Sequence, residues 1–353
     1  MKIDLDFFKG KRILITGHTG FKGTWMCKTL LMLGANVIGY AKEPPTQPNL
    51  YNISDISKDI TSVIGDIRDI DKVCETVKKY QPEIVIHMAA QPIVLESYKN
   101  PVYTYQTNVM GTVNICEAIR LFDFVKSFVN ITTDKVYRNN EWEWGYREND
   151  YLDGYDPYSN SKSCSELVTF SYKRSFFSEK AIAVSTCRAG NVIGGGDFAK
   201  DRIIPDCIRA AEQGKQIEVR NPYSIRPYQH VLEPIMLYLY LAAKQYEQPE
   251  LGDSYNIGPD DCDCISTGKL VDLFCEAWGE GLTWNSTKKE QPHEANFLKL
   301  DSSKIKTVLG WKANWNIKEA ITAVVEWSKE YRNGSNINPI MEKQIKNYIE
   351  YYK

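Results

Sequence analysis

The sequence has almost no excess charge of either sign, and none of its apolar runs is long enough to cross a bilayer. Formal net charge is −2 over 353 residues, so we expect no general attraction to nucleic acid or to anionic membranes. The charged N-terminal segment Met1–Lys11 lacks the apolar core of a signal peptide. These absences predict a cytoplasmic protein that binds neither nucleic acid nor membranes.

Metal-ligand spacing is also absent. The nine cysteines are scattered, and Cys74, Cys116 and Cys187 fall in apolar patterns, as reduced core residues do. Cys262 and Cys264 stand two apart in an acidic stretch without histidine partners, which argues against zinc. We therefore expect no metal site. Internal repeats and low-complexity tracts are lacking too.

What the sequence does contain is a regular alternation of short apolar strands and amphipathic helices up to about residue 190. A sheet of parallel strands covered on both faces produces this alternation. The expected strands are Arg12–Thr16, Asn36–Tyr40, Thr61–Ile64, Ile84–His87, Ser127–Thr132 and Ala183–Arg188, and the expected helices are Gly23–Leu33, Asp69–Tyr80, Val102–Leu121 and Pro157–Phe176.

After residue 190 the alternation breaks at a glycine cluster, Gly194–Gly196. The length suits one large domain and a smaller lobe. We predict an α/β protein with a Rossmann-type, doubly wound parallel sheet over 1–190 and a returning segment near 228–260. A smaller mixed α/β lobe would occupy most of 191–353. The elements expected after residue 190 are Ile204–Gln213, Leu232–Tyr246, Ser254–Gly258, Thr267–Trp278 and Ile317–Asn333.

A glycine-rich segment follows the first expected strand and opens the first expected helix. Gly17, Gly20 and Gly23 have the spacing G-x-x-G-x-x-G. Such glycines allow a tight turn and let the backbone approach a pyrophosphate at the helix N-terminus. The alternative is a βα turn that binds nothing. The strand–loop–helix context favours dinucleotide binding.

The acidic residue that usually ends the second strand and binds the adenosine ribose of NAD is missing. The strand ends in Tyr40-Ala41-Lys42-Glu43, so Glu43 is late and Lys42 has the opposite charge. The residues alone leave NAD and NADP as alternatives, and they predict weaker cofactor binding.

Tyr158 and Lys162 are four residues apart in the helix expected over 157–176, so they share one face of it. A nearby ammonium favours the phenolate, and we expect it to lower the pKa of Tyr158 enough to make it a general base. The spacing alone occurs in many ordinary helices. The glycine-rich segment in the same domain makes the catalytic interpretation the stronger one.

Taken together, these motifs resemble the extended short-chain dehydrogenase/reductase family over nearly the whole chain. Further landmarks are Asp66-Ile67, the strand end His87–Ala90 and Asn108–Thr112. The resemblance implies NAD as cofactor. It places at the cofactor Gly17, Thr19, Gly20, Phe21, Lys22, Gly23, Asp66, Ile67, Ala89, Ala90, Gln91, Asn108, Tyr158 and Lys162.

Within that family the chain is most similar to the nucleotide-sugar 4,6-dehydratases. Most of them carry Asp-Glu after a threonine, and Thr133-Asp134-Lys135 is the variant associated with the CDP-glucose branch. The resemblance implies a CDP-glucose substrate, although no residue distinguishes cytosine from other bases on first principles. Long stretches carry this likeness: His87–Pro92, Trp144–Asn149, Gly154–Lys162, Arg188–Asp197, Asn221–Pro227 and Pro292–Ala295.

The resemblance also implies roles in the reaction. Tyr158 would deprotonate the sugar 4-hydroxyl while hydride leaves C4, Lys162 would assist Tyr158 and hold the nicotinamide ribose, and Thr133 would bind the 4-oxygen. Asp134 would protonate the departing C6 hydroxyl, which requires a raised pKa. Lys135 is either a neutral base for C5 or a charged group that stabilises the enolate. The alternative for Asp134 and Lys135 is a solvent-exposed ion pair at a strand end.

Five residues are candidates for binding the nucleotide sugar: Asn191, Arg202, Asn221, Arg226 and His293. Arg226 suits a pyrophosphate, with a solvated surface arginine as the alternative. Arg202 could instead pair with Asp201 or Asp206, and His293 could be an ordinary loop histidine.

Two surface features remain open. Trp142, Trp144 and Tyr146 could wall the sugar pocket or fill the core. In relatives the helices over 102–121 and 157–176 pair into a dimer, which implies a homodimer or homotetramer, although their apolar faces could serve the monomer core.

Rival activities are a nucleotide-sugar 4-epimerase and a non-catalytic dinucleotide sensor.

Overall fold

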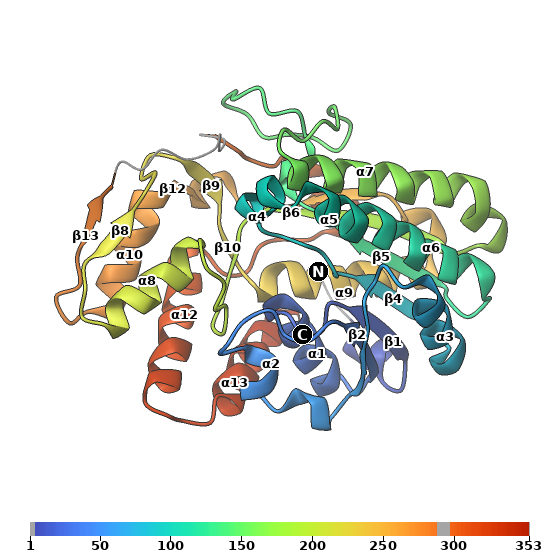
Figure 1. The fold of residues 1–353 in the computed structure, drawn as a ribbon, viewed down its shortest axis with the longest axis horizontal. Coiled ribbons are helices and arrows are strands. Elements are labelled where there is room, and N and C mark those ends of the chain that lie inside the picture. Colours follow the sequence, from blue (N-terminus) through green and yellow to red (C-terminus); the bar gives the residue numbers. More distant parts are fainter. Residues whose placement is uncertain (1–3, 288–296, 353) are drawn as a thin grey trace.

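Seven parallel strands form one central sheet in the computed structural model, which describes residues 4–287 and 297–352. Their order is β11-β6-β5-β4-β1-β2-β3, and β1, β2, β4, β5 and β6 are labelled in Figure 1. The chain reverses direction across the sheet between β1 and β4, and ligands of such sheets bind at the carboxyl ends of the strands at this point. The strands are β1 (Arg12–Thr16), β2 (Asn36–Ala41), β3 (Thr61–Ile64), β4 (Ile84–His87), β5 (Ser127–Ile131), β6 (Ala183–Ala189) and β11 (Ser254–Ile257).

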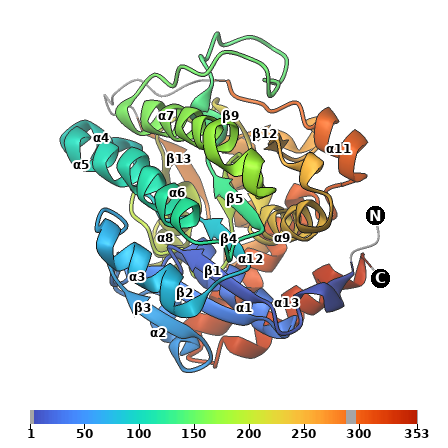
Figure 2. The same ribbon diagram turned by 90° about the vertical axis from the view of Figure 1, so that its right-hand side faces the viewer.

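Successive side chains of a strand point to opposite faces of the sheet, and both sets are apolar here, so helices cover both faces. In β1, Ile13 and Ile15 face one core and Leu14 faces the other. The first core contains α1 (Phe21–Met32) and α9 (Leu232–Glu247). The second contains α3 (Ile70–Tyr80) and α6 (Gly111–Leu121), and α7 (Pro157–Tyr172) packs beside α6 (Figure 2).

A smaller lobe has its own core, in which α8 (Ile203–Glu212), α10 (Thr267–Trp278) and α12 (Ile317–Arg332) meet. Short strand pairs edge this lobe. These are β7 (Val192–Ile193) with β10 (Gln229–His230), β8 (Ile217–Val219) with β13 (Trp284–Ser286), and β9 (Ile225–Pro227) with β12 (Cys264–Ser266).

The predicted fold class is confirmed: a Rossmann-type parallel sheet with a smaller mixed lobe. The expected helix over 102–121 is built as α5 (Pro101–Tyr105), one π-helical turn and α6. Helices that we did not predict are α2 (Leu50–Ile53), α4 (Val94–Lys99), α11 (Ser303–Leu309) and α13 (Asn338–Glu350).

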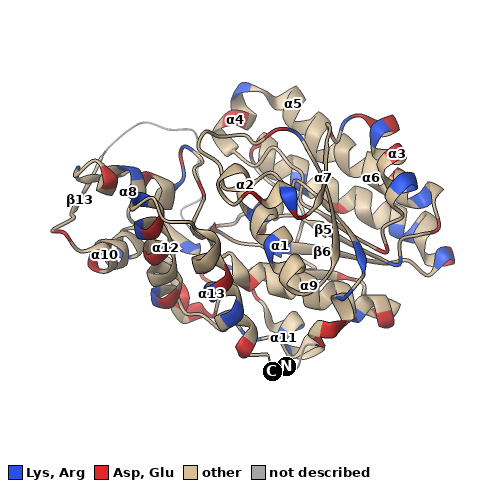
Figure 3. Cartoon of the chain, turned by 90° about the horizontal axis from the view of Figure 1, so that it is seen from below, with Lys and Arg blue, Asp and Glu red and all other residues tan. Residues whose placement is uncertain are grey.

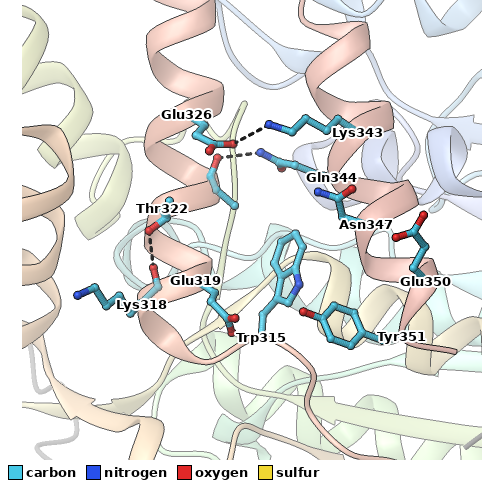
Figure 4. A pocket seen from close by; sticks show the side chains of 11 residues that line it. Trp315, Lys318, Glu319, Thr322, Glu326, Lys343, Gln344, Asn347, Glu350 and Tyr351 are labelled. Atoms are coloured by element: carbon cyan, nitrogen blue, oxygen red, sulfur yellow. Dashed lines mark hydrogen bonds and ion pairs between the residues drawn. The ribbon is translucent and has the colours of Figure 1, made fainter.

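Helix α13 packs on the first core through Met341, Ile345 and Tyr348. A groove of about 720 Å³ lies between α12 and α13, with Trp315 and Tyr351 in its wall (Figure 4). It is bridged by Gln344, which donates to the carbonyl of Ala323 at 2.9 Å. None of the predicted site residues lines this groove.

Lys and Arg are interspersed with Asp and Glu along the outer helices α8, α12 and α13 (Figure 3). Within residues 4–287 and 297–352, no helix is both long and apolar enough to span a membrane. The same described residues contain no cluster of His, Cys, Asp or Glu side chains arranged to hold a metal ion.

Candidate active site

The glycine-rich segment forms the tight turn that its spacing predicts. Gly17 has a φ of +82°, and a Cβ there would lie 2.9 Å from the backbone nitrogen of Ala89. A Cβ on Gly23 would lie 2.1 Å from the carbonyl oxygen of Gly17. Gly20 precedes α1 and offers no side-chain cap to it. The first amides of α1 are thus presented to a ligand, an arrangement suited to a pyrophosphate.

At the end of β2, an acidic group is supplied from the neighbouring strand. Asp66, which follows β3, lies 3.8 Å from Nζ of Lys42 and 2.7 Å from Nη2 of Arg68. Hydrogen bonds from Arg68 hold the pKa of Asp66 below its usual range. Lys42 and Arg68 also lie over the ring of Tyr103. Asp66 thus places a carboxylate, paired with two cations, near the end of β2, and its predicted contact with the cofactor stays a prediction.

The loop after β4 is braced from two sides. The backbone N–H of Ala89 donates to Thr16 Oγ1 at 3.1 Å, and that of Gln91 donates to Asn108 Oδ1 at 2.8 Å. The Asn108 side chain also donates to the hydroxyl of Ser161 on α7 at 2.9 Å. Asn108 therefore joins this loop to the helix that carries Tyr158. Its predicted contact with the cofactor stays a prediction.

Tyr158 and Lys162 lie in the first turns of α7, which begins at Asp156 with the N-cap carboxylate accepting from Ser159. Both side chains are buried. Nζ of Lys162 donates to the carbonyl of Ile131 at the end of β5, at 3.0 Å.

The predicted lowering of the Tyr158 pKa is wrong for the chain alone. Burial raises the pKa of Tyr158 to about 12, and a hydrogen bond with Thr133 and the charge of Arg202 oppose that rise. Burial also lowers the pKa of Lys162 to about 8. The charged forms of both residues lose hydration in the same dry site, and for Tyr158 this outweighs the neighbouring cations.

Asp134 lies in the turn that follows β5 and is 1% exposed. Its Oδ1 accepts a hydrogen bond from Thr133 Oγ1 at 3.0 Å, and its Oδ2 has no partner among the described residues. Burial raises the pKa of Asp134, against the opposing effects of Lys135, Thr133 and Arg226. The predicted rise is confirmed, and the alternative of an exposed strand-end ion pair is wrong. Lys135 itself is partly buried.

Two cations approach this centre from different elements. Arg202, at the N-cap of α8, pairs with Asp197 at 2.9 Å. The alternative pairing with Asp201 or Asp206 is wrong, because those two carboxylates pair with Arg220. Lys22, in the first turn of α1, has its pKa lowered to about 8 by burial and by the charges of Arg202 and Lys162.

The other predicted substrate residues differ in setting. Arg226 lies on β9, is 3% exposed and acts electrostatically on Asp134, so the surface-arginine alternative is wrong. Asn191 is partly buried just after β6, and its carbonyl accepts from the N–H of Gln229. Asn221 is partly buried in the loop before β9. His293 falls outside the described residues.

The aromatic insert divides between core and surface. Tyr146 is buried and stacks on Tyr137 at 5.3 Å between ring centroids, in one core cluster with Leu300. Trp142 packs against Tyr146. Trp144 is 62% exposed. Tyr146 therefore fills the core, as one of the two alternatives predicted.

Sequence reasoning overlooked Glu166. It is fully buried in α7 and bonds both Thr132 and Arg188. A signal was present: Glu166 follows Tyr158 and Lys162 at the same four-residue spacing, and a glutamate on the buried face of a helix requires partners.

The sheet, the glycine-rich turn, and the Tyr158–Lys162 pair facing Thr133 define an extended short-chain dehydrogenase/reductase. Residues 14–324 match the family model described as GDP-mannose 4,6 dehydratase, and the chain belongs to that family.

Similarity to individual proteins covers nearly the whole chain. This chain is 46% identical to CDP-glucose 4,6-dehydratase of Salmonella typhimurium, in an alignment of 353 positions that covers 98% of each chain. It is 25% identical to CDP-paratose 2-epimerase of Salmonella typhi, over 90% of this chain and 99% of that protein.

Solved structures share the fold at lower identity. UDP-glucose 4-epimerase of Thermotoga maritima, crystallised with UDP-glucose, superposes with a TM-score of 0.80 at 21% identity, over 91% of this chain and 99% of that one. dTDP-glucose 4,6-dehydratase of Bacillus anthracis, in complex with NAD, gives 0.77 at 20% identity, over 94% of this chain and 100% of that one.

Proposed function

We propose that this chain catalyses the NAD-dependent dehydration of CDP-glucose to CDP-4-keto-6-deoxyglucose. One observation carries the proposal: Asp134 is a buried carboxyl with a raised pKa and one unpartnered oxygen, and its other oxygen accepts a hydrogen bond from Thr133, which also hydrogen-bonds Tyr158. An acid that can protonate a leaving hydroxyl is what loss of water requires. The 46% identity to a CDP-glucose 4,6-dehydratase supports the same substrate.

The glycine-rich turn suits a dinucleotide. Cβ atoms on Gly17 and Gly23 would collide with the protein's own backbone, so glycine is required for the tight turn that leaves the first amides of α1 open to a pyrophosphate. NAD would be held by this turn and α1, by Asp66 and by the loop after β4. When bound, its nicotinamide would accept hydride from C4 and return it to C6. We assign 1–190 and the returning segment near 228–260 to this cofactor, and most of 191–353 to the nucleotide sugar.

In the first half-reaction, Tyr158 removes the proton of the sugar 4-hydroxyl. Thr133 holds the 4-oxygen, and Lys162 binds the nicotinamide ribose while its charge favours the phenolate. Because burial raises the pKa of Tyr158 to about 12, ionised Tyr158 depends on the cations around it. Arg202 already acts in that direction.

In the second half-reaction, the new 4-keto group acidifies the hydrogen on C5. That proton leaves C5, Asp134 gives a proton to the C6 hydroxyl, and the C6–oxygen bond breaks to release water. When neutral, Lys135 takes the C5 proton as the base. When protonated, it is a counter-charge to the enolate, and water or another group takes that proton. Asn191, Arg202, Asn221, Arg226 and His293 bind the nucleotide sugar.

The deciding experiment is incubation of the purified protein with NAD and, separately, the glucose derivatives of CDP, UDP, dTDP and GDP. The expected result is loss of one water by mass and 4-keto sugar absorbance in alkali, with CDP-glucose the preferred substrate. Conversion at unchanged mass would indicate a 4-epimerase. No conversion of any sugar would favour the non-catalytic dinucleotide sensor.

We also propose that the chain forms at least a dimer through α5, α6 and α7. Apolar side chains stand exposed on these helices: Val102 is 68%, Met110 49% and Leu167 56% exposed. Burying them against a second copy would remove that apolar surface from water. Sedimentation of the purified protein tests this.

A further inference from the structure

Behind the carboxyl end of β5, Glu166 has partners on both of its carboxylate oxygens. Oε1 accepts from the hydroxyl of Thr132 at 2.5 Å. Oε2 accepts from the hydroxyl of Thr186 at 2.6 Å and from Nη2 of Arg188 at 2.9 Å. Glu166 is 0% and Arg188 1% exposed. Several hydrogen bonds together hold such a buried ion pair in one arrangement.

Glu166 and Lys162 lie one turn apart on the same face of α7. The two side chains hydrogen-bond two consecutive residues at the carboxyl end of β5. Lys162 donates to the carbonyl of Ile131, the last residue of β5, and Glu166 accepts from the side chain of Thr132, which follows it. The next residue along the chain is Thr133. The helix that carries Tyr158 is therefore tied to the segment that carries Thr133 and Asp134.

We propose that Glu166 is a positioning residue, which through Thr132 fixes Thr133 and Asp134 at their working distance from Tyr158. This inference rests on the proposed function of that site. Displacement of a catalytic group by a fraction of an ångström slows the chemical step without preventing substrate binding.

The charge of Glu166 has a second effect that a purely structural residue would not have. Among the groups that face Lys162, Lys22 on α1 and His87 on β4 come from other elements, and Glu166 is on its own helix. Burial lowers the pKa of Lys162 and Glu166 opposes that fall, whereas His87 is neutral because its pKa is lowered to about 3. Without the Glu166 charge, Lys162 loses its proton at lower pH.

Two threonines provide a matched pair of variants. Thr132→Val and Thr186→Val each remove one hydroxyl donor to Glu166, and both positions are buried. Only Thr132 adjoins Thr133. We expect Thr132→Val to lower kcat about tenfold or more with KM nearly unchanged, and Thr186→Val to keep kcat within about twofold of the wild-type value. Equal kcat values in the two variants would overturn the inference.

Glu166→Gln completes the test. The expected result is a lower kcat and a high-pH limb of the kcat profile moved to lower pH, while Glu166→Asp moves both back toward wild type. A folded Glu166→Gln with wild-type kcat and profile would overturn the inference. If Glu166→Gln does not fold, the threonine pair decides. Failure of the wild-type enzyme to dehydrate any nucleotide sugar would count against the proposed function instead.

Discussion

Thr133 donates its hydroxyl hydrogen to Oδ1 of Asp134 at 3.0 Å and leaves Oδ2 without a partner among the described residues. A buried carboxyl with one oxygen oriented and the other available is suited to giving up a proton. The pKa of Asp134 is raised by burial, so the proton is retained until a leaving group needs it.

Replacing this acid should separate oxidation from water loss. Asp134→Asn keeps the shape of the side chain but cannot donate a carboxylic proton. C4 oxidation needs only Tyr158, Lys162 and the nicotinamide, so reduced nicotinamide absorbance should build up in a single turnover. The 4-keto-6-deoxy product should form at least about 100-fold more slowly. Product formation at the normal rate would show that Asp134 is structural.

The role of Lys135 can be assigned from the pH dependence of the same reaction. Lys135→Met should also stall after oxidation. If Lys135 is the C5 base, the elimination rate in the wild-type enzyme rises with pH as the lysine deprotonates; if it is a counter-charge, that rise is absent. Lys318→Met is the control, because Lys318 lies in the α12–α13 groove. Unimpaired water loss in both Asp134→Asn and Lys135→Met would show that neither side chain takes part in the elimination and that the pair is structural.

The general base is tested by Tyr158→Phe. Loss of the phenol should lower kcat by about 100-fold or more while substrate binding changes little. Tyr351→Phe, in the groove wall, removes a hydroxyl from an exposed tyrosine and should leave kcat unchanged. Steady-state kinetics on both variants provides the comparison, and a Tyr158→Phe enzyme near wild-type turnover would refute the assignment.

Cofactor binding should be loose. Ala41 supplies no carboxylate for the adenosine ribose, and Asp66 is shared between Lys42 and Arg68. We expect activity after gel filtration to depend on added NAD and to respond much less to NADP. Full activity without any addition, or a preference for NADP, would contradict this.

Stability should vary with pH through Glu233 on α9. Glu233 is fully buried, and burial raises its pKa to about 7 from 4.5. The folded state therefore holds a proton that the unfolded state releases, so the contribution of Glu233 to stability is fully present below about pH 4.5 and is lost as pH rises to about 7. The loss is about 3 kcal/mol.

Glu233→Gln cannot ionise and keeps a carbonyl oxygen for the backbone N–H groups of Asn314 and Trp315. We expect equal Tm at pH 4.5 and a higher Tm than wild type at pH 8. Parallel pH dependence in the two proteins would show that Glu233 does not titrate in this range.

Strong local patterns made most of the sheet predictable. Short apolar runs between helical segments located β1 to β6 to within a residue or two, and Thr267–Trp278 was predicted with the bounds that it has. Helix α13 was not predicted. Its stability comes from contacts of Met341, Ile345 and Tyr348 with a core far away in sequence, and local periodicity does not report such contacts.

The site residues could be named but not their surroundings. Spacing identified Tyr158 and Lys162, yet the direction of the Tyr158 pKa shift depends on burial, which no spacing reveals. For Arg226 the sequence left a solvated surface arginine as an alternative, whereas Arg226 lies on β9, which pairs with β12, and it is buried and acts electrostatically on Asp134. Long-range strand pairing of three residues leaves little trace in sequence.

The most direct test of the account follows a deuterium atom. CDP-glucose labelled with deuterium at C4 should give a product that has lost one water and carries the label at C6, because hydride is taken from C4 and returned to C6 after Asp134 assists the departure of water. Recovery of a sugar of unchanged mass, with the label still at C4, would contradict dehydration.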